Sequence, residues 1–178
     1  MHVALAGHLG SGKSTLAKAL GARLNAPIAS FGAYVRVRAQ EAGLDADDRT
    51  ALQDLGQRLA TEAPAAFVAD FLARNGFSAT PALIYDGVRH VGVWDAIAAH
   101  AGSLPVRSSL IFLVTSPETR RDRLAKRGHA PEQIAHWQSH AMERELDQIK
   151  AAADLEFDGA QALESLVNAF QAAVASSD

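Results

Sequence analysis

The stretch Gly7-His8-Leu9-Gly10-Ser11-Gly12-Lys13-Ser14 decides the fold class of this chain. It fits the pattern G-x-x-x-x-G-K-[ST] without a gap, between an apolar run at Val3–Ala6 and a helix-like stretch at Ser14–Leu24. A strand that turns through glycines into a helix gathers backbone N–H groups and the positive end of the helix dipole around a phosphate. The pattern therefore predicts a phosphate-binding loop at the carboxyl end of a buried strand.

The residue types in this loop predict binding of ATP together with Mg²⁺. We expect Lys13 to neutralise the β- and γ-phosphates and the Ser14 hydroxyl to ligate the metal ion. A dinucleotide site is excluded, because the spacing is not G-x-G-x-x-G and Ser30-Phe31-Gly32 stands where an acid would follow the second strand. The residues expected to bind the nucleotide here are Gly7, Gly10, Ser11, Gly12, Lys13, Ser14 and Thr15.

Short aliphatic runs alternate with helical patterns along the rest of the chain. Strands are expected at Val3–Ala6, Pro27–Ser30, Ala82–Tyr85, Ser109–Thr115 and Leu155–Phe157. Helices are expected at Ser14–Leu24, Gly32–Ala42, Asp47–Ala60, Ala65–Arg74, His90–Ala101, Pro117–Lys126, Pro131–Ala153 and Ala160–Ala175. The alternation predicts an α/β fold of three layers, with a five-stranded parallel sheet flanked by helices. Ligands of such sheets bind at the carboxyl ends of the strands.

Length and composition exclude several classes of protein. The 178 residues fit one domain, and 48% hydrophobic with 21% charged residues argues against extensive disorder. The absence of cysteine excludes disulfides, thiolate zinc sites and cysteine nucleophiles. A formal net charge of −3 argues against a general nucleic-acid binder. No apolar stretch is long enough to span a bilayer and no signal peptide is apparent, so we expect a cytoplasmic protein without a membrane partner.

The ends of the later strands narrow the choice among phosphate-loop proteins. A GTPase would need an Asn-Lys-x-Asp segment to read its base, and the sequence has none. A motor or AAA-type ATPase would usually be larger, with a strand ending in Asp-Glu. Here the third strand is followed by Asp86-Gly87-Val88-Arg89 instead, which argues against that class.

Three segments resemble nucleoside monophosphate kinases, and a fourth resembles a related family of kinases. Ser30-Phe31-Gly32-Ala33-Tyr34-Val35-Arg36 resembles the Ser-Thr-Gly-Asp-x-Leu-Arg segment of adenylate kinases, and Asp86–Arg89 is similar to their Asp-Gly-Phe-Pro-Arg, one residue shorter. Ser109–Arg127 resembles the family's fourth strand and the arginines that enter its lid. Ala153–Gly159 resembles the last strand and loop of dephospho-CoA kinases. Together with the phosphate loop, these segments cover nearly the whole chain in the expected order.

The resemblance implies one kinase domain over residues 1–178, with an acceptor-binding helical insert at about 31–76 and a short lid at about 120–145. It implies that Arg36 and Arg89, with Gly87 between strand and helix, bind the phosphate of the acceptor. A bidentate guanidinium suits that geometry. Arg36 rather than Arg38 is expected to face the cleft, because the two lie on different faces of one helix.

The resemblance also implies which residues surround the transferred phosphoryl group. Asp86 would orient the waters of Mg²⁺ or the attacking group, which makes it a catalytic residue together with Lys13 and a metal-binding residue together with Ser14. Arg120, Arg123 and Arg127 recur at spacings of three and four, so they share one helical face. On that face Arg120 would bind ATP, whereas Arg123 and Arg127 would act in catalysis. Arg144 is a weaker candidate for the same role.

The expected function is an ATP-dependent kinase that acts on a nucleoside or deoxynucleoside monophosphate. Ala33 stands where adenylate kinases carry aspartate, so the resemblance does not extend to strict AMP specificity. A dephospho-CoA kinase is one alternative, although Ser30-Phe31-Gly32 replaces the aspartate of those enzymes. The other alternative is a nucleotide sensor that binds ATP, hydrolyses it slowly and holds a macromolecule. The expected partner is a small phosphorylated molecule, not nucleic acid, and the chain is expected to be a monomer or homodimer.

Overall fold

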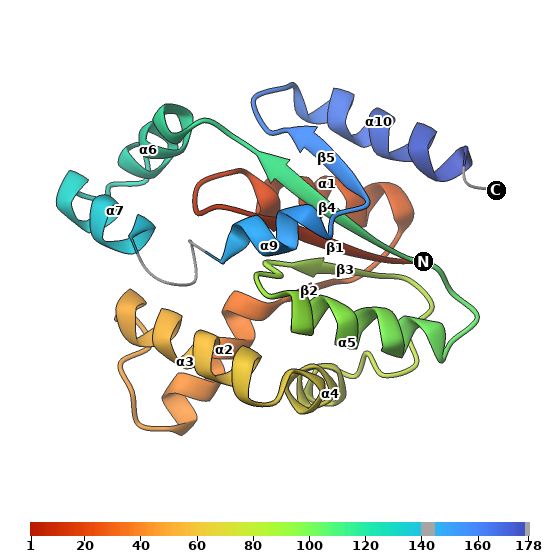
Figure 1. Cartoon of the computed structure of the whole chain (residues 1–178), viewed down its shortest axis with the longest axis horizontal. Helices are drawn as coiled ribbons and strands as arrows, with labels where there is room; N and C mark the ends of the chain where they lie inside the picture. The colour runs from red at the N-terminus through yellow and green to blue at the C-terminus, as the bar shows by residue number, and fades with distance from the viewer. Residues whose placement is uncertain (140–144, 177–178) are drawn as a thin grey trace.

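The computed structural model describes residues 1–139 and 145–176 as a parallel β-sheet with helices on both faces, as Figure 1 shows. The strands are β1 (His2–Gly7), β2 (Ile28–Ser30), β3 (Leu83–Asp86), β4 (Ser108–Val114) and β5 (Leu155–Asp158). Their order across the sheet is β2-β3-β1-β4-β5, and every neighbouring pair is parallel. The predicted α/β fold with a five-stranded parallel sheet is therefore confirmed.

Each face of the sheet has its own apolar core. Val3 and Leu5 of β1 face one side, whereas Ala4 and Ala6 face the other, which is the alternation that a strand imposes. The first side is covered by α1 (Lys13–Leu24) and α10 (Leu163–Ala175). The second side is covered by α2 (Phe31–Glu41), α3 (Arg49–Glu62), α4 (Pro64–Arg74), α5 (Val91–Gly102) and α9 (Leu146–Ala151).

Two helices in the segment where a lid is expected form a separate small layer beside the phosphate loop. They are α6 (Pro117–Ala125) and α7 (Pro131–Gln138), and they lie at one end of the molecule in Figure 1, opposite the N-terminus and the end of α10. Leu124 and Ile134 pack there against Leu9 of the loop, with Trp137 at the edge of the cluster. The lid is thus joined to the loop by apolar contacts.

The order of the strands decides where a ligand can bind. From β1 the chain crosses to β2 at one edge, and after β3 it crosses back over β1 to β4. The connections between successive strands therefore reverse their direction across the sheet. At such a point of reversal a crevice forms at the carboxyl ends of the strands. The loop that follows β1 lies at that point, with the loop after β3 next to it.

Two expected helices differ from the observed ones by more than two residues at one end or both. The single helix expected over Pro131–Ala153 was wrong, because α7 is capped at Ser139 and α9 begins only at Leu146. The last helix begins at Leu163 rather than at Ala160, since residues 159–162 form the turn that leaves β5. Within the described ranges, no helix is long and apolar enough to cross a membrane.

Candidate functional site

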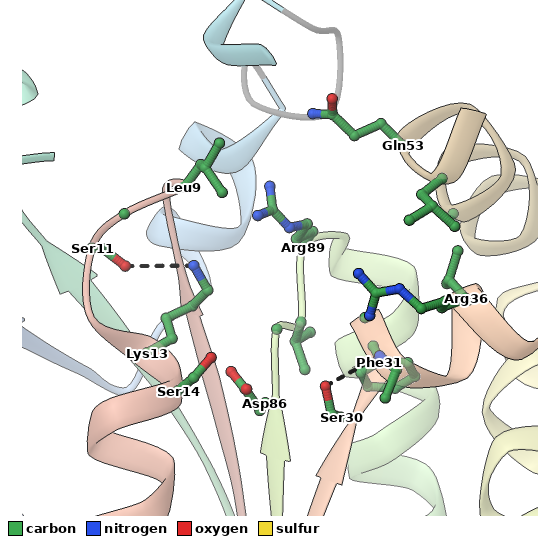
Figure 2. Close-up of a pocket in the computed structure, with 18 of the residues that line it drawn as sticks. Leu9, Ser11, Lys13, Ser14, Ser30, Phe31, Arg36, Gln53, Asp86 and Arg89 are labelled. Atoms are coloured by element: carbon green, nitrogen blue, oxygen red, sulfur yellow. Dashed lines mark hydrogen bonds between the residues drawn. The ribbon is translucent and has the colours of Figure 1, made fainter. Parts of the chain in front are cut away.

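A cleft of about 950 Å³ opens at the carboxyl ends of β1, β2 and β3. The phosphate loop and the start of α1 form one wall, and α2, α3 and the loop after β3 form the other, as Figure 2 shows. Arg127 from the lid and Leu163 from the start of α10 complete the lining. The structure thus gathers the ends of distant segments around one space, as the sequence predicted for a parallel sheet.

The phosphate loop takes a backbone conformation that needs glycine. Gly10 has φ 82° and Gly12 has φ 106°, both in the region that side chains rarely adopt. Gly12 is also the N-cap of α1, so the positive end of that helix points into the cleft. The Lys13 ammonium lies over the loop, where its Nζ donates to the carbonyl oxygens of Gly7 at 2.6 Å and His8 at 2.9 Å. These groups form a cradle of donors for phosphate oxygens.

Ser14 and Asp86 meet across the floor of the cleft. Ser14 is on the first turn of α1 and Asp86 ends β3, and Figure 2 shows the hydroxyl and the carboxylate directed toward each other. A hydroxyl and a carboxylate are the oxygen donors that Mg²⁺ prefers, and this ion usually keeps several waters beside one or two protein ligands. The donor set therefore fits a magnesium ion between them.

Two arginines face the loop from the opposite wall. Figure 2 shows the guanidinium groups of Arg36 and Arg89 directed into the space between the loop and α3. Arg36 also donates to the carbonyl of Ala46 at 3.2 Å, which holds its side chain along the start of the insert. Gly87, with φ 94°, makes the turn that carries the chain from β3 to Arg89. The two arginines place two positive charges on the wall of the cleft opposite the phosphate loop.

Arg38 takes a different role, as the choice of Arg36 predicted. Its guanidinium donates to the Tyr34 hydroxyl at 2.8 Å and to the Asp70 carboxylate at 3.0 Å, away from the cleft. The hydrogen bond from the Tyr34 hydroxyl is the main cause that lowers the pKa of the Asp70 carboxyl. This group ties α2 to α4 and so fixes the wall from which Arg36 projects.

The wall of the cleft that carries Arg36 also has an apolar slot. The Phe31 ring stacks on Phe71 at 4.2 Å between centroids and an interplanar angle of 18°, and on Phe67 at 5.3 Å and 27°. Phe31 and Phe67 both line the cleft. The other apolar side chains along the slot are Val35, Leu52, Ala60 and Val93. Such walls suit a flat ring better than a polyol.

The three lid arginines do not share one role. Arg127 lines the cleft, in agreement with the expected position. Arg123 lies behind the phosphate loop and donates to the backbone carbonyls of Ser11 at 2.8 Å and Gly159 at 2.7 Å. Arg123 is not among the residues that line the cleft, and its catalytic role stays a prediction. The backbone of Arg120 packs against Gly10, so closely that a Cβ on that glycine would lie 2.9 Å from the Arg120 carbonyl.

One polar chain of contacts was missed in the sequence. His90 Nδ1 lies 3.1 Å from Glu145 Oε2, and Gln57 Nε2 donates to Glu145 Oε1 at 2.8 Å. Burial lowers the pKa of His90, although the Glu145 carboxylate opposes the shift. The three residues join α5, the start of α9 and α3 around the cleft. They lie 33 or more positions apart along the chain and follow no motif, so no sequence signal could have found them. Arg144 lies outside the described residues.

The insert and the lid also contact each other above the cleft. Gln53, which lines the cleft and is 6% exposed, donates its Nε2 to the Trp137 carbonyl at 3.3 Å. The Arg49 guanidinium lies 5.1 Å from the centre of the Trp137 ring, and Thr50 Oγ1 lies 3.2 Å from His136 Nε2. Helices α3 and α7 therefore meet over the mouth of the site.

These features define a P-loop nucleotide-binding protein: a glycine loop that leads into a helix N-terminus, a lysine above the loop, and a hydroxyl that faces a carboxylate. Residues 3–151 match the family model AAA_18, described as AAA domain, and the chain belongs to this family. The match agrees with the phosphate-loop class that the sequence predicted. No curated protein matches the chain by sequence.

The fold is that of P-loop kinases. Shikimate kinase from Aquifex aeolicus has a TM-score of 0.59 and 17% identity over 98% of this chain and 96% of that chain. A gluconokinase from Sinorhizobium meliloti 1021 has a TM-score of 0.60 and 18% identity over 94% and 87%. Shikimate kinase from Bacteroides thetaiotaomicron has a TM-score of 0.54 and 17% identity over 98% of both chains. These likenesses agree with the resemblance to P-loop kinases drawn from the sequence.

Proposed function

We propose that this chain is a kinase that transfers the γ-phosphoryl group of ATP to a nucleoside or deoxynucleoside monophosphate. The observation that carries the proposal is a phosphate loop facing the Arg36 and Arg89 anion site across one cleft. A protein that only sensed ATP would have no use for a second anion site opposite its phosphate loop. The likeness to kinase structures supports the same class of reaction.

The residues of the cleft supply position and charge, which are the main requirements of phosphoryl transfer. Lys13 and the N–H groups of the loop hold the phosphates of ATP, and Arg36 and Arg89 hold the anionic acceptor in line with them. Ser14 and Asp86 would hold Mg²⁺, which neutralises charge on the phosphates when bound. Arg127 is the lid residue placed to meet the charge that develops on the transferred group.

The apolar slot favours a nucleotide over a small hydroxy acid as the acceptor. Two of the similar structures are named as shikimate kinase and gluconokinase, and an arginine pair binds a carboxylate as well as a phosphate. A polyol acid in this slot, however, would leave its hydroxyls against Phe31, Phe67 and Val93, and unpaired buried hydroxyls are costly. A base bound there would bury a flat apolar surface instead.

A phosphorylation assay tests the proposal directly. ADP release from ATP and Mg²⁺ is measured with each nucleoside and deoxynucleoside monophosphate, dephospho-CoA, shikimate and gluconate. We expect one or more monophosphates to accelerate release far above hydrolysis by water. Arg89→Ala should lower kcat/KM for that acceptor about 100-fold, or about 2.7 kcal/mol, with ATP affinity nearly unchanged. Arg107→Ala, before β4 at the other end of the sheet, is the matched control.

Asp86→Asn separates a kinase from a sensor. The change removes the charge and keeps the size, so a kinase should lose two or more orders of magnitude in kcat while ATP still binds. If only shikimate or gluconate accelerates ADP release, the acceptor is a hydroxy acid and not a nucleotide. Acceleration by no small acceptor, with hydrolysis that responds to a macromolecule, would favour a sensor.

A further inference from the structure

The carbonyl oxygen of Ser11 accepts two hydrogen bonds from outside the phosphate loop. Arg123 Nη1 on α6 donates to it at 2.8 Å, and Thr115 Oγ1, just after β4, donates at 3.2 Å. The same guanidinium donates through Nη2 to the carbonyl of Gly159, after β5, at 2.7 Å. One side chain thus connects the loop after β1 with the ends of β4 and β5.

These contacts fix the orientation of one peptide unit. In a trans peptide the C=O and the N–H point in opposite directions. The Ser11 carbonyl points toward Arg123 and Thr115, so the N–H of Gly12, which belongs to the same planar unit, points away from them. Gly12 lines the cleft. The orientation of a phosphate-binding N–H is therefore set from behind the loop.

The packing around this unit leaves no room for adjustment. A Cβ placed on Gly159 would lie 2.8 Å from the Ser11 carbonyl oxygen and would overlap Thr115 Oγ1. Ser11 and Thr115 are buried, with 0% and 7% of their surfaces exposed. Buried hydrogen bonds to a charged donor are short and strong, and a partner left alone there is costly. The Ser11 peptide unit is held in one orientation by its surroundings.

We propose that Arg123 is a positioning residue for the phosphate loop, acting through the Ser11 carbonyl rather than on the nucleotide itself. The proposal rests on the proposed function in that the loop binds the phosphates of ATP. It gives Arg123 a role different from that of Arg127, which faces the cleft. A loop that loses this contact can rotate its Ser11–Gly12 peptide unit. The Gly12 N–H then no longer points toward the phosphates.

Titration calorimetry of ATP and ADP, each with Mg²⁺, tests the proposal. In Arg123→Ala, we expect both ligands to lose affinity by a similar factor, about 10-fold or more, because the cradle serves the phosphates common to both. Arg123→Lys should lose less, since one ammonium can reach one carbonyl but not both in a fork. Arg121→Ala is the matched control, because Arg121 is exposed on the same helix and pairs only with Glu118 at 3.5 Å among the described contacts.

Two outcomes would overturn the proposal that Arg123 positions the phosphate loop. A loss for ATP alone would mean that Arg123 contacts the γ-phosphate. A lower melting temperature with both affinities intact would mean that Arg123 only stabilises the fold. Thr115→Val removes the second donor to the same carbonyl and should show a smaller loss of both affinities, which provides the test if Arg123→Ala does not fold.

A failure of the proposed function can be told apart from a failure of this inference. If the unaltered protein binds neither nucleotide, the proposed function is wrong, whereas hydrogen exchange at the amides of Gly12 to Thr15 still tests the positioning role. Exchange there should be faster in Arg123→Ala than in Arg121→Ala. Equal exchange in the two variants would overturn the inference.

Discussion

Lys13 shows how a single side chain is shared between structure and ligand. It is 8% exposed, and its Nζ donates to two carbonyl oxygens of its own loop. An ammonium so placed can turn from those oxygens to a phosphate without moving the backbone. Its identity and its place were both predictable, because a contiguous motif specifies them. Arg123 was not predictable in the same way, since its partners Ser11 and Gly159 lie 112 and 36 positions away.

At the residue scale, Lys13→Ala should abolish stabilisation by ATP. Ligand at about 100 times its dissociation constant should add about 2.7 kcal/mol to the free energy of unfolding of the unaltered protein. The variant lacks the charge that holds the phosphates, so ATP with Mg²⁺ should leave its melting temperature unchanged. Differential scanning fluorimetry measures both, with Lys126→Ala, an exposed lysine at the end of α6, as the control. An unshifted melting curve in the unaltered protein would refute ATP binding at this loop.

At the scale of helices and strands, periodic patterns predicted where elements lie better than where they end. The spacing of Arg120, Arg123 and Arg127 predicted one helical face, but a spacing rule holds only while the helix continues. Helix α6 ends at Ala125, so Arg127 lies in the turn beyond it and reaches the cleft. In the same way, the amphipathic pattern over 131–153 predicted a single helix and gave no sign that α7 ends at Gln138. Local caps decide such ends, and tertiary contacts can favour them.

The packing of α1 against β2 leads to a prediction at this scale. Gly21 of α1 lies so close to β2 that a Cβ would be 2.9 Å from Cγ1 of Ile28 and 3.0 Å from the Ala26 carbonyl oxygen. Gly21→Ala gains up to about 1 kcal/mol of helix propensity, but overpacking against backbone costs about 1–3 kcal/mol. We expect a net loss of about 1 kcal/mol in the free energy of unfolding.

Chemical denaturation measures this change against Gly102→Ala. A Cβ on Gly102, at the end of α5, would have no atom within 4 Å, so that variant should be neutral or slightly more stable. A gain in stability for Gly21→Ala would show that α1 and β2 can separate at little cost.

For the molecule as a whole, the sequence predicted the class of fold and one end of the sheet as the site. It could not predict which strands are neighbours, because the order β2-β3-β1-β4-β5 arises from packing between distant segments. The wall of the cleft that carries Arg36 and Arg89 illustrates what the sequence could and could not predict. Arg36 and Arg89 were expected from short matches to known kinases, whereas the stacking of Phe31 on Phe67 and Phe71 depends on how α2 and α4 pack.

The stability of the whole fold should depend on pH through two buried histidines. Burial lowers the pKa of His2, against the opposing hydrogen bond to the Thr80 carbonyl, and burial also lowers the pKa of His90. Between the folded pKa and the unfolded value of about 6.5, the unfolded chain binds more protons. The contribution of these two histidines to the free energy of unfolding should therefore be fully present above about pH 6.5. It should decrease as the pH falls below that value.

Urea denaturation between pH 8 and pH 5 measures this dependence. Each histidine contributes at most about 1.4 kcal/mol per pH unit. His2→Gln keeps polar atoms near the Thr80 carbonyl and the Tyr85 hydroxyl and should reduce the slope, whereas His136→Gln, on the exposed side of α7, should not. A slope unaffected by His2→Gln would assign the pH dependence to other groups.

The central position of β1 has a consequence for the synthesis of this protein on the ribosome. Both of its partners, β3 and β4, are made some 80 to 110 residues after it. An emerging N-terminal segment therefore holds an apolar strand with two unpaired edges, which is a hazard for aggregation. The Arg123 and Gly159 contacts add a later requirement, since the nucleotide cradle is complete only after residue 159 has been added. A nascent chain of this protein should gain protection by ATP only once Gly159 has been made and can fold into place.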